Sequence, residues 1–288
     1  MRILVTGSRG QLGCELCRRF AQRAAGLSHD QLDITDRQAV ESRLASLRPD
    51  VVINTAAYNA VDRAESDAAA CQAVNADAVG HLAEACRRID ATLVQISTNY
   101  VFGDDAVPRR PYRESDPPAP LGVYACSKLA GERLAAACPR HLIIRTCGLY
   151  GQRPPGVPPG NFVDTMLRFG RQGGVVRVVN DQHCTPSSAA DVAAAIQFLV
   201  ETSAVGLFHV TSGGATTWYT FAAEIFRRAR LAVNLEPISS AEFAAPAARP
   251  AYSVLDTTQY HALNGPPMSP WQAALGRYLA EIGAAPHS

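Results

Sequence analysis

The sequence predicts an α/β protein in which a doubly wound parallel sheet carries a smaller C-terminal lobe. Three short apolar runs have the composition of strands buried on both faces, and a helical stretch follows each of them. These runs are residues 2–6, 50–54 and 92–97. Strands that alternate with helices favour a parallel sheet, because a helix connects each strand to the next parallel one.

A segment rich in proline and glycine divides the chain. Residues 152–160 read Gln-Arg-Pro-Pro-Gly-Val-Pro-Pro-Gly, which is the strongest linker signal in the sequence. We therefore expect one domain at residues 1–150 and a smaller lobe at 151–288. The helical stretch 189–201 has two open placements, within the lobe or packed back on the first domain.

The overall composition excludes several classes of partner. With 288 residues, 47% hydrophobic, the chain can bury a large core. The 27 basic and 26 acidic residues form no long block of one charge, so neither nucleic acid nor an acidic membrane surface is expected. No apolar run approaches the ~18 residues of a spanning helix, and the first strand leaves no room for a signal peptide. We expect a cytosolic protein that binds a small molecule.

The cysteines and histidines do not indicate a metal site. Cys14 and Cys17 form a C-x-x-C within a helical pattern, but no second Cys or His pair stands at zinc-binding spacing. The seven histidines show no ligand spacing either. Most of the eight cysteines are expected to be small buried hydrophobes. The reactivity of Cys126 stays open, because it lies beside two candidate catalytic residues described below.

A glycine-rich loop follows the first strand and opens a helix. Spaced glycines in that context let the backbone turn tightly and aim helix amides at a pyrophosphate, as in Rossmann-type folds. The spacing here is G-x-x-G-x-x-G. The predicted dinucleotide-binding residues are Gly7, Ser8, Arg9, Gly10, Gln11, Leu12 and Gly13. Arg9 is suited to a 2′-phosphate, which favours NADPH as the cofactor and leaves NADH open.

The second strand-and-helix unit, which follows the helix after the glycine loop, has a very short strand. Residues 26–30 are barely a strand, and no acidic residue stands at their end to hold an adenosine ribose. Asp33 is a candidate for the adenine amino group, with Ile34 packed on the ring, although a purely capping role for residues 33–36 is equally open. Asp36 is the expected N-cap of a helix at 37–47.

The next two strand ends complete the expected crevice. Ligand sites in open α/β sheets lie beyond the carboxyl ends of the strands. After the strand at 50–54, the small side chains of Ala56 and Ala57 let a cofactor pass close to the backbone, beside Tyr58. A long helical stretch at 62–89 leads to the strand that ends at Thr98. That hydroxyl is a candidate hydrogen-bond donor to a substrate carbonyl.

Tyr124 and Lys128 stand four residues apart on an expected helix, and therefore on one face. A phenol with a pKa of ~10 transfers protons poorly at neutral pH, and a nearby cation lowers that pKa. Such a tyrosine can protonate a substrate oxygen during a reduction. The same spacing arises by chance in many amphipathic helices, so the pair alone does not decide between a catalytic site and a solvated face.

Together these motifs resemble the extended short-chain dehydrogenase/reductases, and within them most closely the dTDP-4-dehydrorhamnose reductases. The resemblance spans essentially the whole chain, and its combination of motifs is specific where each part is not. The matching segments are 7–13, 32–36, 54–58, 61–62, 97–102, 124–128, 145–146, 161–162, 181–182, 217–218, 249–250 and 255–256.

The resemblance implies hydride transfer from a reduced nicotinamide to the 4-keto carbon of a nucleotide-activated 6-deoxysugar. Tyr124 matches the family's proton donor, Lys128 the residue that holds the nicotinamide ribose and lowers the Tyr pKa, and Thr98 the third catalytic hydroxyl. The implied partners are NADPH and a nucleotide sugar, in a monomer or homodimer. The candidate substrate-binding residues are Thr98, Asn99, Tyr100, Tyr124, Gly148 and Arg249. Arg249 is the candidate for the diphosphate, because a guanidinium suits phosphate oxygens, and a solvated loop arginine is the alternative for it.

Three departures from the family pattern fall on the substrate side, so the identity of the sugar stays open. Asn99 replaces an aspartate, Cys147-Gly148 replaces Ser-Trp, and Cys184 replaces a glycine. Trp218 is either a core residue or faces the nucleotide base. Two alternatives remain: a non-catalytic NADP-binding subunit like the regulatory subunit of methionine adenosyltransferase, or a nucleotide-sugar epimerase or dehydratase.

Overall fold

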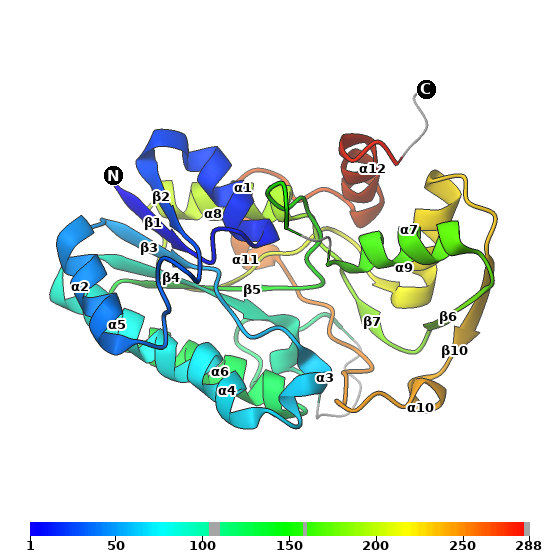
Figure 1. The fold of residues 1–288 in the computed structure, drawn as a ribbon, viewed down its shortest axis with the longest axis horizontal. Coiled ribbons are helices and arrows are strands. Elements are labelled where there is room, and N and C mark those ends of the chain that lie inside the picture. The colour runs from blue at the N-terminus through cyan, green and yellow to red at the C-terminus, as the bar shows by residue number, and fades with distance from the viewer. Residues whose placement is uncertain (104–109, 158–159, 285–288) are drawn as a thin grey trace.

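The computed structural model describes residues 1–103, 110–157 and 160–284. No helix in these ranges is long and apolar enough to cross a membrane. The described chain forms two parts that lie side by side, a larger one built on a central sheet and a smaller one mainly of helices (Figure 1).

The central sheet has six parallel strands in the order β2-β1-β3-β4-β5-β8. Its strands are β1 (Ile3–Thr6), β2 (Ala24–Leu27), β3 (Val51–Asn54), β4 (Thr92–Thr98), β5 (His141–Thr146) and β8 (Gly206–His209). The chain runs from β1 outward to β2 and then returns to the other side of β1 for β3. This reversal is the switch point at which open parallel sheets bind ligands, so it confirms the predicted fold class.

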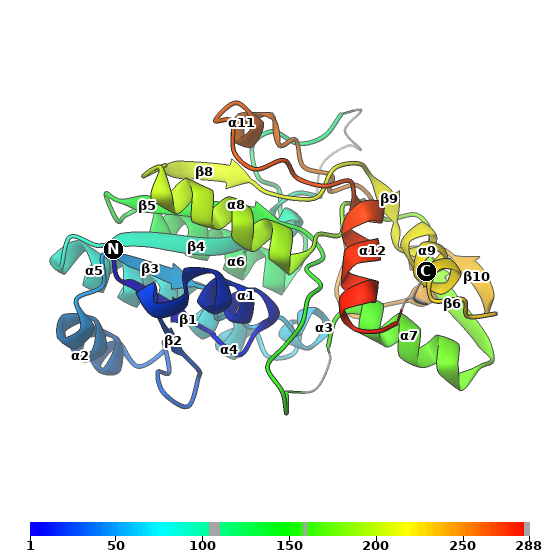
Figure 2. The ribbon, with the colours of Figure 1, turned by 90° about the horizontal axis from the view of Figure 1, so that it is seen from above.

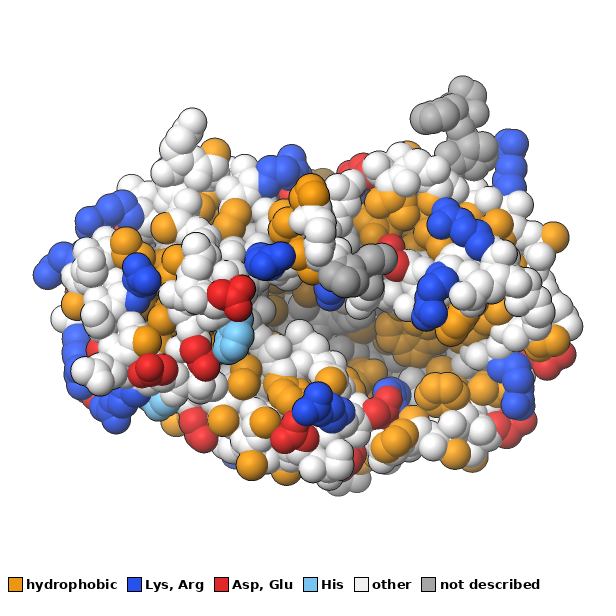
Figure 3. Space-filling model, viewed as in Figure 1, with side chains coloured by type: hydrophobic (Ala, Val, Ile, Leu, Met, Phe, Trp, Pro, Cys, Tyr) orange, Lys and Arg blue, Asp and Glu red, His pale blue; other side chains and the backbone are white. Residues whose placement is uncertain are grey.

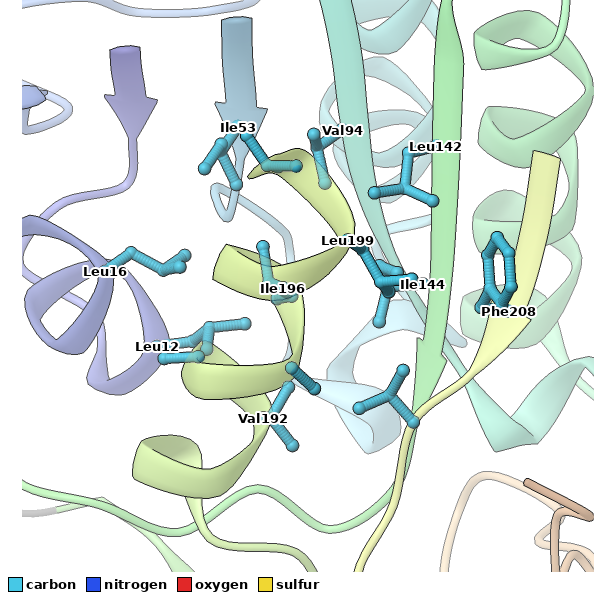
Figure 4. Packing of buried hydrophobic residues seen from close by; sticks show 14 of the residues in the cluster. Leu12, Leu16, Ile53, Val94, Leu142, Ile144, Val192, Ile196, Leu199 and Phe208 are labelled. Carbon is cyan, nitrogen blue, oxygen red and sulfur yellow. The ribbon is translucent and has the colours of Figure 1, made fainter. Parts of the chain in front are cut away.

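Helices cover both faces of this sheet, which is why most residues of its strands are apolar. On one face lie α1 (Gln11–Phe20) and α8 (Ala189–Glu201), and on the other lie α2 (Arg37–Leu47), α5 (Ala78–Arg88) and α6 (Val123–Ala135) (Figure 1). Side chains alternate between the faces. Ile53 and Val94 pack under α8 (Figure 4), while Val52 and Leu93 point to the other face and pack under α5. Ile196 and Leu199 of α8 fill the space beside Leu16 of α1.

Two local predictions are confirmed. Asp36 caps α2 as expected, since its Oδ1 accepts from the Ala39 amide at 3.0 Å. The expected helical stretch 62–89 is helical over most of its length. It consists of α3 (Val61–Ala64), a turn at 65–67, and then α4 (Ala68–Gln72), a π-helical turn (Ala73–Asp77) and α5 without a break. The buried Asn75 side chain bonds both the amide and the carbonyl of Tyr58, so the turn is widened to hold the loop after β3.

The smaller lobe has its own hydrophobic core under three helices and two small sheets. The helices are α7 (Phe162–Gln172), α9 (Trp218–Arg228) and α12 (Trp271–Glu281). One sheet pairs β6 (Val175–Val179) with β10 (Asn234–Ile238) in parallel, and the other pairs β7 (His183–Cys184) with β9 (Thr216–Thr217) in antiparallel. The short helix α10 (Ser240–Phe243) follows β10, whereas the short helix α11 (Thr258–His261) packs beside β8, with Tyr260 in the core of the larger part.

The chain crosses between the two parts more than once. After α7 and β6 have formed part of the lobe, α8 and β8 return to the large sheet, and the chain then goes back to the lobe for α9 (Figure 2). The helix 189–201 therefore packs on the first part, one of its two expected placements. The division at residue 150 stays a prediction, and β8 belongs to the sheet although it follows that residue by more than 50 positions.

Candidate active site

A cavity of about 380 Å³ lies at the carboxyl ends of the central strands, against the smaller lobe. The space-filling view, drawn from the same side as Figure 1, shows a hollow in the surface between the two parts of the molecule (Figure 3). Its lining combines the glycine loop, the ends of β3, β4 and β5, the start of α6, and residues of the linker and α9. Segments far apart in the sequence thus share one hollow, because parallel strands all end at the same edge of the sheet.

The glycine loop packs too closely on its neighbours to carry side chains. Gly7 has φ +68°, and a Cβ there would lie 2.6 Å from the Ala56 amide nitrogen. A Cβ on Gly13 would lie 2.4 Å from the Gly7 carbonyl oxygen. The helix α1 begins directly after Gly10 without a side-chain cap, so its first amides are available to a pyrophosphate.

A second hollow of about 490 Å³ continues from the first at Gly10 and Ala56. The predicted adenosine-side residues that line it are Gly7, Arg9, Asp33, Ile34, Ala56, Ala57 and Tyr58. The carboxylate of Asp33 accepts from the amide and hydroxyl of Thr35, at 2.9 and 2.7 Å, so it also fixes its own loop. Ser28 and His29 join this lining, and their position after β2 could have suggested them.

Among the predicted cofactor residues, Ser8 lines neither hollow. The Ser8 amide donates to the Leu27 carbonyl at 3.1 Å, and a Cβ added at Gly26 would lie 2.9 Å from the Ser8 Cβ. Ser8 therefore fastens the loop to β2, and its direct contact with a cofactor stays a prediction. Gln11, Leu12 and Gly13 line the first cavity.

Thr98, Tyr124 and Lys128 are all buried and line the first cavity together. Thr98 ends β4, and the other two lie on successive turns of α6. A hydrogen bond joins the side chains of Thr98 and Tyr124, and the Tyr124 hydroxyl lies 3.5 Å from Asn59 Oδ1. The structure thus places the three predicted catalytic side chains in one pocket.

The expected lowering of the Tyr124 pKa is wrong for this geometry. Burial raises the pKa of Tyr124 to about 12, while the bond to Thr98 acts in the opposite direction. Lys128 Nζ donates instead to the Ile96 carbonyl at 2.7 Å. Burial lowers the pKa of Lys128 to about 8, with the Glu132 carboxylate opposing that change. Desolvation is therefore the largest influence on the pKa of the Tyr124 phenol.

A buried ion pair fixes α6 against the sheet below Lys128. Arg145 on β5 donates from Nε and Nη2 to the two oxygens of Glu132, at 2.9 and 2.7 Å, and Ser97 donates to the same carboxylate. This bidentate pair holds the catalytic helix at a defined height on β4 and β5. Sequence reasoning passed over Glu132, although it stands one helical turn after Lys128.

On the substrate side, Asn99 and Tyr100 face the cavity but are tied to the rest of the protein. Asn99 Nδ2 donates to Ser253 Oγ at 2.7 Å and Asn99 Oδ1 accepts from Thr98 Oγ1 at 3.3 Å. The donor that distinguishes asparagine from aspartate therefore holds the C-terminal segment. Tyr100 meets Tyr124 edge to face at 6.1 Å between ring centroids.

Arg249 is placed differently from the expectation that it faces the cavity. Its two terminal nitrogens bond the two oxygens of Asp62, both at 2.9 Å, and it does not line the first cavity. Its role at a diphosphate stays a prediction. The cationic residues among the described lining are Lys128 and Arg153, and the Arg153 Nη2 lies 3.0 Å from where a Gly160 Cβ would be.

The cysteines of the described chain form no disulfide, and no group of its acidic, Cys and His residues could hold a metal ion. Cys126 is exposed. Cys147 and Cys184 are buried, and a hydrogen bond between them, together with burial, raises the pKa of Cys184 well above its usual value. Two of the departures from the family pattern therefore meet in one contact beside the cavity.

Comparison with known proteins gives a consistent result. A family model described as the RmlD substrate binding domain matches residues 1–284. The dTDP-4-dehydrorhamnose reductase of Streptomyces griseus is 43% identical over 285 residues, covering 95% of this chain and 91% of that protein. A Streptomyces antibioticus protein, a probable dTDP-4,6-dihydroxy-2-methyloxan-3-one 4-ketoreductase, is 40% identical and covers 100% and 97%.

A solved structure is similar to this chain over nearly its whole length. The structure of Bacillus anthracis dTDP-4-dehydrorhamnose reductase in complex with NADP is similar to this chain with a TM-score of 0.92 at 35% identity. The similarity covers 97% of this chain and 99% of that one.

Proposed function

The chain belongs to the RmlD substrate-binding domain family, and on that basis we propose that it reduces the 4-keto group of a nucleotide-activated 6-deoxysugar with NADPH. Its most direct substrate is dTDP-4-dehydro-L-rhamnose, which yields dTDP-L-rhamnose. The observation that carries this proposal is the meeting of Thr98, Tyr124 and Lys128 in one cavity beside the glycine loop. The named relatives and the NADP complex of a similar structure support it.

The residues of the two connected hollows fit a dinucleotide. Glycines at 7 and 13 keep the loop flat against Ala56, so a pyrophosphate can approach the backbone. Arg9 is the candidate for the 2′-phosphate. Its exposed ion pair with Asp30, 3.9 Å long, is weak enough for a phosphate to displace. When bound, the reduced nicotinamide supplies the hydride that adds to the carbonyl carbon.

Tyr124 then has the role of proton donor. Addition of hydride turns the ketone into an alkoxide, and an alkoxide is more basic than a phenolate. A phenol with a pKa of about 12 is fully protonated at neutral pH, so it arrives at the reaction with its proton in place. The hydroxyl of Thr98 stabilises the phenolate that is left behind, and water returns the proton before the next turnover. Lys128 contributes positive charge below its own pKa.

Arg153 is the candidate ligand of the substrate diphosphate. A guanidinium binds phosphate oxygens with two parallel hydrogen bonds, and Arg153 lines the cavity on its linker side. Arg249 does not line this cavity, so it is a weaker candidate. This assignment puts the nucleotide end of the substrate at the linker and the ketone at Tyr124.

The test is consumption of NADPH with dTDP-4-dehydro-L-rhamnose, followed by the absorbance of the reduced nicotinamide and by identification of the product sugar. We expect one NADPH to be consumed per dTDP-L-rhamnose formed. A second substrate is the 4-ketosugar that gives the Streptomyces antibioticus relative its name. Tight NADPH binding without turnover of either sugar would refute the proposal. Turnover without net NADPH consumption would indicate an epimerase or dehydratase.

A further inference from the structure

Gly148 leaves a gap in the wall of the cavity close to the catalytic residues. The strand β5 ends at Thr146, which pairs in register with Thr98 on β4. Two residues later the chain turns at Gly148, with φ +49°, and this residue lines the cavity without a side chain. The conformation favours glycine, because side chains rarely adopt positive φ. The lining here must therefore come from another part of the chain.

The indole of Trp218 occupies that gap. A Cβ on Gly148 would lie 3.0 Å from Trp218 Cη2, so the far edge of the indole starts where a side chain at 148 would begin. Trp218 is separated from Gly148 by 70 positions and is the first residue of α9. It also lines the cavity that Thr98 and Tyr124 line.

Trp218 is held rigidly in this position. Thr217 caps α9, accepting from the Thr220 amide at 3.1 Å, which fixes the backbone at the start of the helix. The Phe162 ring packs on the indole with 4.7 Å between centroids, and the Phe221 ring meets it edge-on at 6.4 Å. An aromatic ring that is fixed by its own core loses little freedom when a ligand packs against it.

We infer that Trp218 determines the sugar specificity of this site, by forming the apolar wall against which the 6-deoxy end of the sugar packs. This inference rests on the proposed function and adds a residue to it. Gly148, which lies against the indole, and Cys147 before it in the cavity lining offer no strong hydrogen-bonding side chain to a 6-hydroxyl. A methyl group forms no hydrogen bonds with water and therefore loses none when it is buried there. A buried hydroxyl would lose its hydrogen bonds to water without gaining new ones.

The chain offers a direct probe of this contact, because it contains two tryptophans. Trp271 is buried in the lobe core, packs on the same Phe221 at 5.6 Å, and does not line the cavity. In the variant Trp271→Phe, Trp218 is the sole tryptophan, so its fluorescence reports on this wall. The titrants are dTDP and the product dTDP-L-rhamnose, each added to protein that holds saturating oxidised NADP.

We expect dTDP-L-rhamnose to change the Trp218 fluorescence and dTDP alone to leave it nearly unchanged. A signal of the same size from dTDP would place the indole at the nucleotide, and no signal from either ligand would leave it a core residue. Either result overturns the inference. Binding of both ligands is measured independently by calorimetry, so an absent signal is distinguished from absent binding.

Mutation gives the second test. Trp218→Ala should weaken dTDP-L-rhamnose by about tenfold or more, the scale of a lost apolar contact in a pocket, and leave dTDP affinity unchanged. Trp218→Phe is the second variant if the alanine protein fails to fold, and Trp271→Phe is the matched control for loss of a lobe indole. Unchanged sugar affinity in both Trp218 variants would overturn the inference. Failure of the proposed function is distinct, because it shows as no ketosugar turnover by the unmodified protein.

Discussion

The two halves of the active site are built in different ways. The cofactor half is made of short consecutive segments, the loop 7–13 and the residues that follow β3, and its fit depends on backbone shape at glycines. The substrate half is made of single side chains from segments far apart, such as Arg153 on the linker and Trp218 on α9. A site that is formed by backbone atoms of one segment can be predicted from the sequence. A site that is formed by side chains from distant segments can be found only in the packed structure.

The largest effect is expected where the two halves meet. Tyr124→Phe removes the proton donor and should lower kcat by about 10²–10⁴-fold, the usual contribution of a positioned acid. The dissociation constant of NADPH should stay nearly unchanged, because the glycine loop is untouched. Steady-state kinetics and a cofactor titration measure the two quantities. Tyr260→Phe, which removes a hydroxyl bonded to the Pro266 carbonyl at 2.8 Å outside both hollows, is the matched control and should retain kcat.

A Tyr124→Phe variant with the unmodified rate would mean that the proton comes from another group. A large loss of NADPH affinity in the same variant would mean that Tyr124 also holds the cofactor, and the cofactor and substrate halves of the site would then not be separate.

The next effect compares two arginines. Arg153→Gln should raise the KM for the nucleotide sugar by about tenfold or more, since a charge-assisted hydrogen bond contributes ~1.5–3 kcal/mol. Arg249→Gln should leave KM nearly unchanged and lower the melting temperature instead, because it breaks the pair with Asp62. The measurements are KM at saturating NADPH and thermal unfolding. A raised KM in Arg249→Gln together with an unchanged KM in Arg153→Gln would identify Arg249 as the diphosphate ligand instead.

The smallest effect is a pH dependence on the cofactor side. Burial lowers the pKa of Lys128 from its usual value to about 8, so its ammonium is lost as pH rises through that value. The kcat/KM for NADPH should therefore fall by up to about tenfold per pH unit above about 8. Tyr124 keeps its proton over this range, because its pKa is about 12. Lys128→Arg keeps the charge and should abolish this decline at a lower overall rate, whereas a flat profile for the unmodified protein would contradict the assignment.

Much of the fold could be predicted because it rests on local rules. The expected helix at 37–47 agrees with the bounds of α2, since Asp36 bonds an amide three residues away. The helical stretch at 62–89 could be predicted too, but its π-helical turn could not, since Asn75 in that turn bonds Tyr58, 17 positions away, and Ser127, 52 positions away. No pattern within the helix itself predicts such contacts.

By itself the sequence determined the fold class, three strands of the sheet with the glycine loop, and the shared face of Tyr124 and Lys128, because backbone conformation and helical spacing depend on residues a few positions apart. Tertiary structure decided the rest. It set the Tyr124 pKa by burial, paired Arg249 with Asp62 across 187 positions, and brought the Trp218 indole against Gly148. Desolvation and long-range contact arise only when distant segments pack together, so the substrate side of the site is a property of the packed chain.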